Sequence, residues 1–270
     1  MGKIIAVANQ KGGVGKTTTS VNLAASLGVL EKKVLIIDAD PQANATSGLG
    51  IDVAQVSVGT YQILEHTALA VEAIVPTDSP NLDIIPAHID LVAIEIELVD
   101  MPDREQMLRK ALAPIKEAYD YILIDCAPSL GLLTLNALTA ADSVIIPIQC
   151  EYYALEGLSA LMNTIARVAD SINPNIIIEG LLRTMYDPRN SLTNDVSDQL
   201  MQHFGERVYR TVIPRNVRLA EAPSHGLPAL AYDRNSKGSL AYLALAGEIL
   251  RLEKQQSTNT KLECVVVKMS

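Results

Sequence analysis

A glycine-rich segment near the N-terminus limits the folds open to this chain more than any other part of its sequence. Residues 11–18 read Lys-Gly-Gly-Val-Gly-Lys-Thr-Thr and follow the apolar run of residues 3–8. From Lys16 to about Val29 the sequence has a helical pattern. A strand, a glycine-rich turn and a helix in this order form a P-loop, in which backbone N–H groups and the positive helix N-terminus surround phosphate oxygens. The segment therefore predicts a phosphate-binding site at the start of an α/β domain.

Each residue type in this loop has a chemical reason to be there. Glycine lets the backbone curl so that its N–H groups point inward at phosphate. Lys16 is predicted to reach the β- and γ-phosphates of ATP, and the Thr17 hydroxyl to coordinate Mg²⁺. The residues predicted to contact the nucleotide from this loop are Lys11, Gly12, Gly13, Val14, Gly15, Lys16, Thr17 and Thr18. The predicted cofactors are accordingly ATP and Mg²⁺.

The rest of the chain alternates between apolar runs and helix-length segments. Strands are predicted at residues 33–38, 83–86, 121–125, 143–147, 176–182 and 209–213, and helices at residues 103–118, 129–141, 153–170, 191–203 and 240–253. Strands that are apolar throughout indicate a mostly parallel, twisted sheet with helices on both faces. No repeat or linker interrupts this pattern. We predict a single α/β domain over residues 1–254 and a loosely ordered tail over residues 255–270.

Several classes of protein are disfavoured by what the sequence lacks. The apolar run of residues 3–8 is too short for a signal peptide or a membrane span, and no segment approaches eighteen apolar residues. Cys126, Cys150 and Cys264 have no CxxC spacing, which disfavours a disulfide framework and a zinc site. We expect a cytoplasmic protein with reduced cysteines.

Carboxylates follow two of the predicted strands. Asp38 and Asp40 end one strand, and Asp125 ends another. The carboxyl ends of parallel strands share one edge of a sheet, which is where α/β proteins bind ligands. Asp38 and Asp125 are therefore predicted to hold Mg²⁺ together with Thr17, directly or through water. The alternative is that each aspartate merely caps the following turn.

Charge is distributed unevenly along the chain. The formal net charge is −9, and residues 1–100 contain 5 basic and 12 acidic side chains. Residues 180–240 reverse this balance with 8 basic and 6 acidic side chains, and all but one of the basic residues are arginines. An acidic protein can still present a local positive face. An ordinary solvated surface with a mild arginine excess is the alternative.

The loop departs from the usual Walker A pattern in one informative way. Gln10 replaces the usual first glycine, and Lys11 adds a second lysine ahead of the glycines. This variant resembles the deviant Walker A loop of the ParA/MinD family of ATPases. The resemblance implies that Lys11 crosses a dimer interface to the partner's nucleotide, and that ATP joins two subunits. Residues 38–42 are similar to the family's switch segment, which implies that Asp40 orients the attacking water. The implied catalytic residues are Lys11, Lys16 and Asp40.

Longer phrases resemble one branch of that family, the chromosomal ParA (Soj) group. They are residues 40–50, 184–187, 213–218, 221–224 and 226–228. The resemblance implies a partition ATPase whose ATP-bound dimer binds double-stranded DNA without sequence preference on the nucleoid. It also implies a centromere-binding ParB-like partner that stimulates hydrolysis. By position, Arg189 and Arg218 are the implied DNA contacts, and Met185, Pro214 and Asn216 the implied adenine contacts.

Two alternatives within this fold remain open. A MinD-like ATPase positions itself on a membrane through a C-terminal amphipathic helix, for which the tail shows no pattern, so no membrane partner is expected. A cofactor-loading ATPase would use the same fold to drive transfer of a small molecule or cluster.

Ala43 and Ala127 replace residues common in the ParA group, and both positions could alter switch dynamics.

Overall fold

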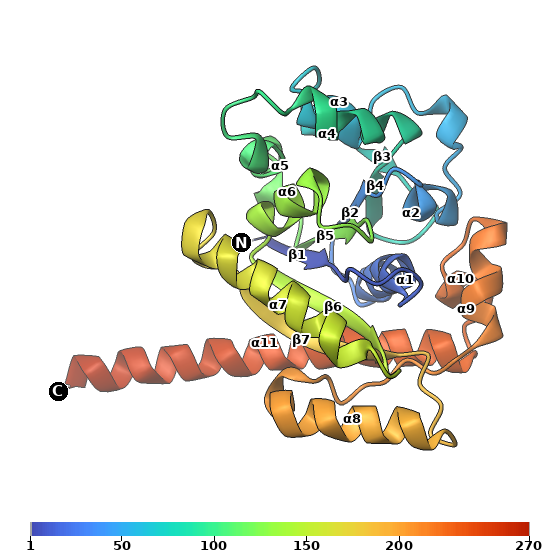
Figure 1. Ribbon diagram of the computed structural model, residues 1–270, viewed down its shortest axis with the longest axis vertical. Coiled ribbons are helices and arrows are strands. Elements are labelled where there is room, and N and C mark those ends of the chain that lie inside the picture. The colour runs from blue at the N-terminus through green and yellow to red at the C-terminus, as the bar shows by residue number, and fades with distance from the viewer. Residues whose placement is uncertain (1, 270) are drawn as a thin grey trace.

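The computed structural model describes residues 2–269, except for the side chains of residue 95 and of residues 256–269. A seven-stranded sheet lies at its centre, with the strand order β3-β4-β2-β5-β1-β6-β7 (Figure 1). All neighbouring strands are parallel except β3, which is antiparallel to β4. The strands are β1 (Lys3–Val7), β2 (Val34–Ala39), β3 (Val75–Pro76), β4 (Leu82–Ile85), β5 (Tyr121–Cys126), β6 (Ser143–Gln149) and β7 (Ile177–Thr184). This confirms the predicted fold class.

Helices cover both faces of the sheet (Figure 1). The main helices are α1 (Lys16–Val29), α5 (Met107–Leu112), α6 (Leu132–Ala140), α7 (Ala154–Ser171), α8 (Ser191–Phe204) and α11 (Lys237–Met269). The shorter ones are α2 (Asn44–Gly48), α3 (Thr60–Leu64), α4 (Ile94–Glu97), α9 (Val217–Glu221) and α10 (Ala229–Tyr232). Among the described residues, no helix combines the length and the apolar character that crossing a membrane would require.

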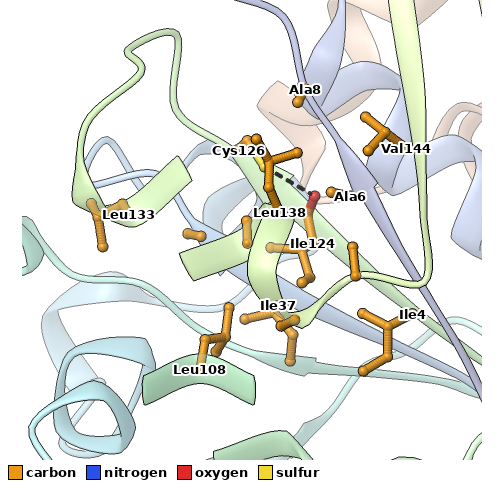
Figure 2. Close-up of a cluster of buried hydrophobic side chains, with 14 of the residues drawn as sticks. Ile4, Ala6, Ala8, Ile37, Leu108, Ile124, Cys126, Leu133, Leu138 and Val144 are labelled. Atoms are coloured by element: carbon orange, nitrogen blue, oxygen red, sulfur yellow. Dashed lines mark hydrogen bonds between the residues drawn. The ribbon is translucent and has the colours of Figure 1, made fainter. Parts of the chain in front are cut away.

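The two faces of the sheet form two separate hydrophobic clusters. Along β1, Ile4 and Ala6 belong to one cluster and Ile5 belongs to the other, because successive side chains of a strand point to opposite faces. The first cluster extends to α5, α6 and α7, and Figure 2 shows part of it. The second is formed with α1 and α11, which pack against each other. Burial on both faces explains why the central strands are apolar throughout.

Two segments within the domain differ from the sequence predictions. The single helix predicted at residues 103–118 is interrupted after α5, because Pro114 has no N–H with which to continue a helix. The strand predicted at residues 209–213 is wrong. Only isolated bridges join this region to β7 and its end, and the N–H groups of Arg210 and Thr211 are bound by the Glu248 carboxylate instead.

The last helix is longer than its sequence pattern indicated. The pattern predicts an end near residue 253, whereas α11 runs to Met269. The assignment of residues 255–270 to a loosely ordered tail stays a prediction.

Candidate functional site

The glycine-rich loop connects the end of β1 to the start of α1. Gly13 and Gly15 have φ angles of 73° and 89°, which only glycine adopts without strain. A Cβ atom placed on Gly12 or Gly13 would meet nothing within 4 Å, so the space beside the loop is open. Gly15 is the N-cap of α1 and no side chain caps that helix end. The free N–H groups and the helix dipole are therefore available to an anion.

Hydrogen bonds to the distant strands β6 and β7 hold this loop in place. The Asn9 amide donates to the Pro147 carbonyl at 2.7 Å, and its oxygen accepts the Lys11 N–H at 3.0 Å. The Thr184 hydroxyl, at the end of β7, donates to the Val14 carbonyl at 2.8 Å. Thr184 lies in one of the phrases that resemble the Soj group, but neither the sequence of that phrase nor that around Asn9 indicates these contacts with the loop.

Lys16 is a buried cation to which no carboxylate of the described residues is bound. Its ammonium donates to the Lys11 carbonyl at 3.2 Å, and 7% of the residue is exposed. Burial lowers the pKa of Lys16, and the nearby carboxyls of Asp125 and Asp40 act in the opposite direction. An incoming polyphosphate would supply the negative charge that this ammonium lacks.

Asp38 and Asp125 are direct neighbours on the parallel strands β2 and β5. Both are fully buried, which raises the pKa of Asp38 to about 6 and that of Asp125, with repulsion from Asp38, to about 7. Oδ2 of Asp38 accepts the N–H and hydroxyl of Thr46 at 2.9 and 2.7 Å. Oδ1 of Asp125 accepts the Ser20 hydroxyl at 2.8 Å, whereas its Oδ2 has no hydrogen-bond partner in the described chain.

This arrangement fits a bound divalent cation. An unpartnered, buried carboxylate oxygen beside a second carboxylate is costly unless a positive charge joins it. The Thr17 hydroxyl also lies close enough to Asp125 to lower its pKa. Within the described residues, no three His, Cys, Asp or Glu side chains gather where they could hold a metal on their own. Mg²⁺ suits such a site, because it keeps water and phosphate oxygens among its ligands.

Asp40 lies just beyond the end of β2. Its N–H donates to Oδ1 of Asp38 at 3.2 Å, and its own Oδ1 accepts the Gln42 N–H at 3.0 Å. It is 6% exposed and acts electrostatically on Lys16. The predicted catalytic carboxylate is thus fixed at the same edge of the sheet as the loop and the carboxylate pair.

Lys11 points at a residue of its own chain. Its Nζ lies 2.6 Å from Oε2 of Glu151, which precedes α7, and both side chains are nearly half exposed. Exposed aromatic rings at Tyr152 and Tyr153 follow Glu151 and pack edge to face. Nothing in the local sequence around Glu151 indicates that it is the partner of Lys11.

A cavity of about 210 Å³ opens beside the loop. It is lined by Gly15, Thr18, Thr184, Met185, Ile213, Arg215, Asn216, Leu219, Ala220 and Tyr242. Two of the three predicted adenine contacts, Met185 and Asn216, are in this lining. Pro214 is not, and it pairs with Tyr186 instead. Asn216 also caps α9, because its side chain accepts the Arg218 N–H at 3.0 Å.

The two arginines predicted to contact DNA are exposed but paired within the chain. Arg189 donates to both carboxylate oxygens of Asp187, at 2.9 and 2.8 Å, and lowers the pKa of Asp187 to about 2. Arg218 lies 2.8 Å from a carboxylate oxygen of Glu221 and 3.2 Å from one of Asp233. Each guanidinium therefore reaches solvent while its charge is partly balanced.

Comparison with known proteins agrees with this geometry. Residues 2–178 match the AAA domain family. The chain is 57% identical over 249 residues to the sporulation initiation inhibitor protein Soj of Bacillus subtilis, covering 92% of this chain and 98% of that protein. It is 49% identical over 256 residues to the chromosome-partitioning ATPase Soj of Treponema pallidum, covering 95% and 100%.

A solved structure shares this fold. Cobyrinic acid a,c-diamide synthase from Mycobacterium smegmatis, with bound ADP and magnesium, superposes with a TM-score of 0.81 at 37% identity. The match covers 94% of this chain and 96% of that chain.

Proposed function

Since this chain belongs to the Soj/ParA family of chromosome-partitioning ATPases, we propose that it is a nucleotide-switched ATPase whose ATP-bound dimer binds DNA. The single observation that carries the ATPase assignment is the unpartnered Oδ2 of Asp125 beside the open P-loop. A buried carboxylate with a free oxygen fits a metal ion, and a glycine cradle next to it fits phosphate.

Different side chains of this chain would have different roles in ATP hydrolysis. Lys16 supplies positive charge to the β- and γ-phosphates as charge develops on them. Asp125 and Thr17, with Asp38 beside them, would hold Mg²⁺, which when bound neutralises charge on the phosphate oxygens. Asp40, whose N–H donates to Asp38 and whose Oδ1 accepts the Gln42 N–H, orients the attacking water.

Dimerisation would exchange one partner of Lys11 for another. In the single chain its ammonium is bound to Glu151. An ion pair between side chains this exposed stabilises by about 0–1 kcal/mol, so a triphosphate presented by a second subunit can displace Glu151. Lys11 would then neutralise charge where two anionic nucleotides approach each other.

DNA binding would likewise replace carboxylate partners of the arginines with phosphate oxygens of DNA. Arg189 and Arg218 are held by carboxylates at exposed positions, where phosphate oxygens can compete for the guanidinium. One chain offers few such contacts, while a dimer held together by ATP offers twice as many on one rigid surface. Binding without sequence preference would place the protein on the nucleoid in the cytoplasm, with a ParB-like partner stimulating hydrolysis and release.

The test is DNA binding measured with ATP and with ADP. We expect scrambled duplexes to bind in filter assays only with ATP, and Arg189→Ala or Arg218→Ala to weaken every duplex alike. Each substitution should reduce the slope of log affinity against log salt by about 1 to 2, because one or both subunits lose a phosphate contact. Arg167→Ala, on α7 outside the arginine-rich segment, is the matched control.

Other outcomes would favour the alternatives. Equal DNA binding in ATP and ADP would contradict the switch. ATP-dependent sedimentation with lipid vesicles but not with DNA would favour a MinD-like function. Binding to neither DNA nor lipid would favour a cofactor-loading ATPase. This alternative remains because the Mycobacterium smegmatis protein with the same fold is a cobyrinic acid a,c-diamide synthase.

A further inference from the structure

A short helical segment on the outer surface is anchored by one apolar side. The 3-10 helix η3 (Ile89–Ala93) runs directly into α4, which is followed by Leu98. Leu91, Ile94 and Leu98, spaced three and four residues apart, are buried in the first hydrophobic cluster. This spacing places them on one face of a helix, and their burial fixes the segment to the protein.

The opposite side of this segment is also apolar. Ile89, Val92, Ile96 and Val99 repeat at helical spacing, and each is more than half exposed. Ile96 is the most exposed of them at 77%. We call these four residues the outer stripe. A surface helix normally has one apolar face, and no contact among the described residues accounts for this second face. Contiguous exposed apolar surface is typical of an interaction site.

The outer stripe is separate from the nucleotide site. α4 and α3 lie at one extreme of the molecule in Figure 1, where the Tyr61 hydroxyl of α3 donates to the Glu97 carboxylate at 2.8 Å. None of the four stripe residues belongs to the P-loop, the carboxylate pair, the 210 Å³ cavity or the two arginine sites. A partner on this surface would therefore leave the nucleotide contacts unobstructed.

The surroundings of the outer stripe are strongly acidic. Residues 88–103 contain five Asp and Glu residues and no Lys or Arg. The nearest guanidinium, that of Arg104, donates to the Val99 carbonyl at 2.7 Å and is paired with Glu105. Asp90, Glu97 and Asp100 belong to the same short segment as the stripe. Such a surface repels DNA, anionic lipid and any acidic protein, and attracts a cation. A second copy of this chain, docking through the same face, would bring the two acidic rims together.

We propose that the outer stripe is the docking surface for a cationic amphipathic helix of a partner protein. The stripe from Ile89 to Val99 extends about 15 Å, which matches three turns of an α-helix. Apolar side chains of the partner helix would pack between the stripe residues, as in other helix-on-surface complexes. Lys or Arg at the borders of that helix would face the acidic rim, and would fix which partners are accepted.

The experiment uses the full chain and a synthetic peptide. The probe is a fluorescent 15-residue helix with Leu on one face and Lys on the other. Its controls are a Leu/Glu peptide of the same pattern and a Leu/Lys peptide with the order scrambled. In anisotropy titrations without nucleotide, we expect the Leu/Lys helix to bind at least about tenfold more tightly than either control, because only it matches both the stripe and the rim.

Variants then locate the binding. Val92→Ser with Ile96→Ser should weaken the Leu/Lys helix by at least about tenfold, since two central apolar contacts are lost. Ile177→Ser is the matched control, because Ile177 is similarly exposed but starts β7 at the other edge of the sheet. Asp90→Asn with Asp100→Asn should weaken binding mainly at low salt. The ATPase rate should stay that of the unmodified chain in all of these variants, which shows that they fold.

Hydrogen exchange gives an independent location. Bound peptide should protect the backbone of residues 88–101 and leave residues 9–18 unchanged. Peptide affinity unaffected by Val92→Ser with Ile96→Ser, or protection elsewhere, would overturn the proposal. So would nucleotide-independent self-association that these two substitutions abolish, because a second copy of the chain would then be the occupant.

Discussion

At the scale of single residues, the carboxylate of Asp125 is the most unusual group of the site. It is buried beside Asp38, has one oxygen without a partner in the described chain, and has a raised pKa. A raised carboxyl pKa means that the folded chain keeps a proton that the unfolded chain has already released. The folded state is therefore destabilised as pH rises from about 4 to about 7. The buried carboxylate pair therefore lowers the stability of the folded state without a cation, and in exchange provides a binding site for one.

This gives a prediction for Asp125→Asn. Without nucleotide and with a chelator present, the free energy of unfolding of the unmodified chain should fall between pH 5 and pH 7.5, by roughly 1–3 kcal/mol from this pair. Asp125→Asn should flatten that dependence, and should also slow MgATP hydrolysis. Urea titrations at several pH values measure the effect, with exposed Asp170→Asn as the control. If the pH dependence is unchanged in Asp125→Asn, the carboxyl pair of Asp38 and Asp125 is not its cause.

Lys11 and Glu151 form a pair whose two members should behave differently. Lys11→Ala should leave ATP binding to the single chain within a few fold but weaken ATP-dependent dimerisation by roughly 100-fold, because two triphosphates then approach without that charge. Glu151→Gln should preserve dimerisation or strengthen it up to about fivefold, because the ion pair that it removes is half exposed. Light scattering with ATP distinguishes them. Equal loss in both variants would mean that the pair itself is part of the interface.

At the scale of elements, the end of β7 is coupled to the P-loop. The hydroxyl of Thr184 is buried and donates to the Val14 carbonyl, and Thr184 also lines the cavity beside the loop. The loop is thus held from β7 as well as from β1 and β6. Two segments separated by 170 residues in sequence are joined by one hydrogen bond at the phosphate site.

Thr184→Val should therefore affect nucleotide binding through the loop. The substitution keeps the side-chain volume but leaves the Val14 carbonyl without its donor, at a cost of about 1–3 kcal/mol. We expect a lower melting temperature and roughly 5- to 100-fold weaker ADP binding, because the loop loses the bond that fixes its shape. Thr164→Val, whose hydroxyl bonds its own helix at an exposed site, is the control. Full nucleotide affinity in Thr184→Val would show that β1 and α1 alone shape the loop.

The sequence predicted the central strands well because they are buried on both faces and carry an unmistakable apolar pattern. It could not predict α4, which is four residues long and is fixed by packing of Ile94. The strand predicted at residues 209–213 failed because a distant carboxylate, Glu248, binds its N–H groups. No local pattern contains that information.

In the candidate site too, features with a local sequence pattern could be predicted and contacts between distant segments could not. The P-loop and the aspartates at the strand ends could be located from local patterns, and the structure brings them together. Their assigned roles stay predictions. The contacts of Glu151 and Thr184 with the loop could not be predicted, because both residues reach it from segments more than 130 residues away.

At the scale of the whole molecule, dimerisation should appear in thermal stability. A ligand or partner that binds only the folded state stabilises it by mass action, about 2.7 kcal/mol at 100 times its dissociation constant. With Asp40→Ala to prevent hydrolysis, the melting temperature should rise with protein concentration in MgATP. In MgADP it should depend on nucleotide concentration alone. Calorimetry at protein concentrations spanning two decades measures this, and an ATP curve independent of protein concentration would contradict the dimer.

The acidic stretch of residues 34–103 and the arginine-rich segment of residues 180–240 also make the molecule an electric dipole. α4 lies at one extreme of the molecule in Figure 1 and α8, which follows Arg189, at the other. In the field of a polyanion such a molecule experiences a torque before any contact forms. The torque would orient the molecule before contact, so that its arginine-rich segment faces the polyanion. The outer stripe would then face away from the polyanion and remain accessible to solvent.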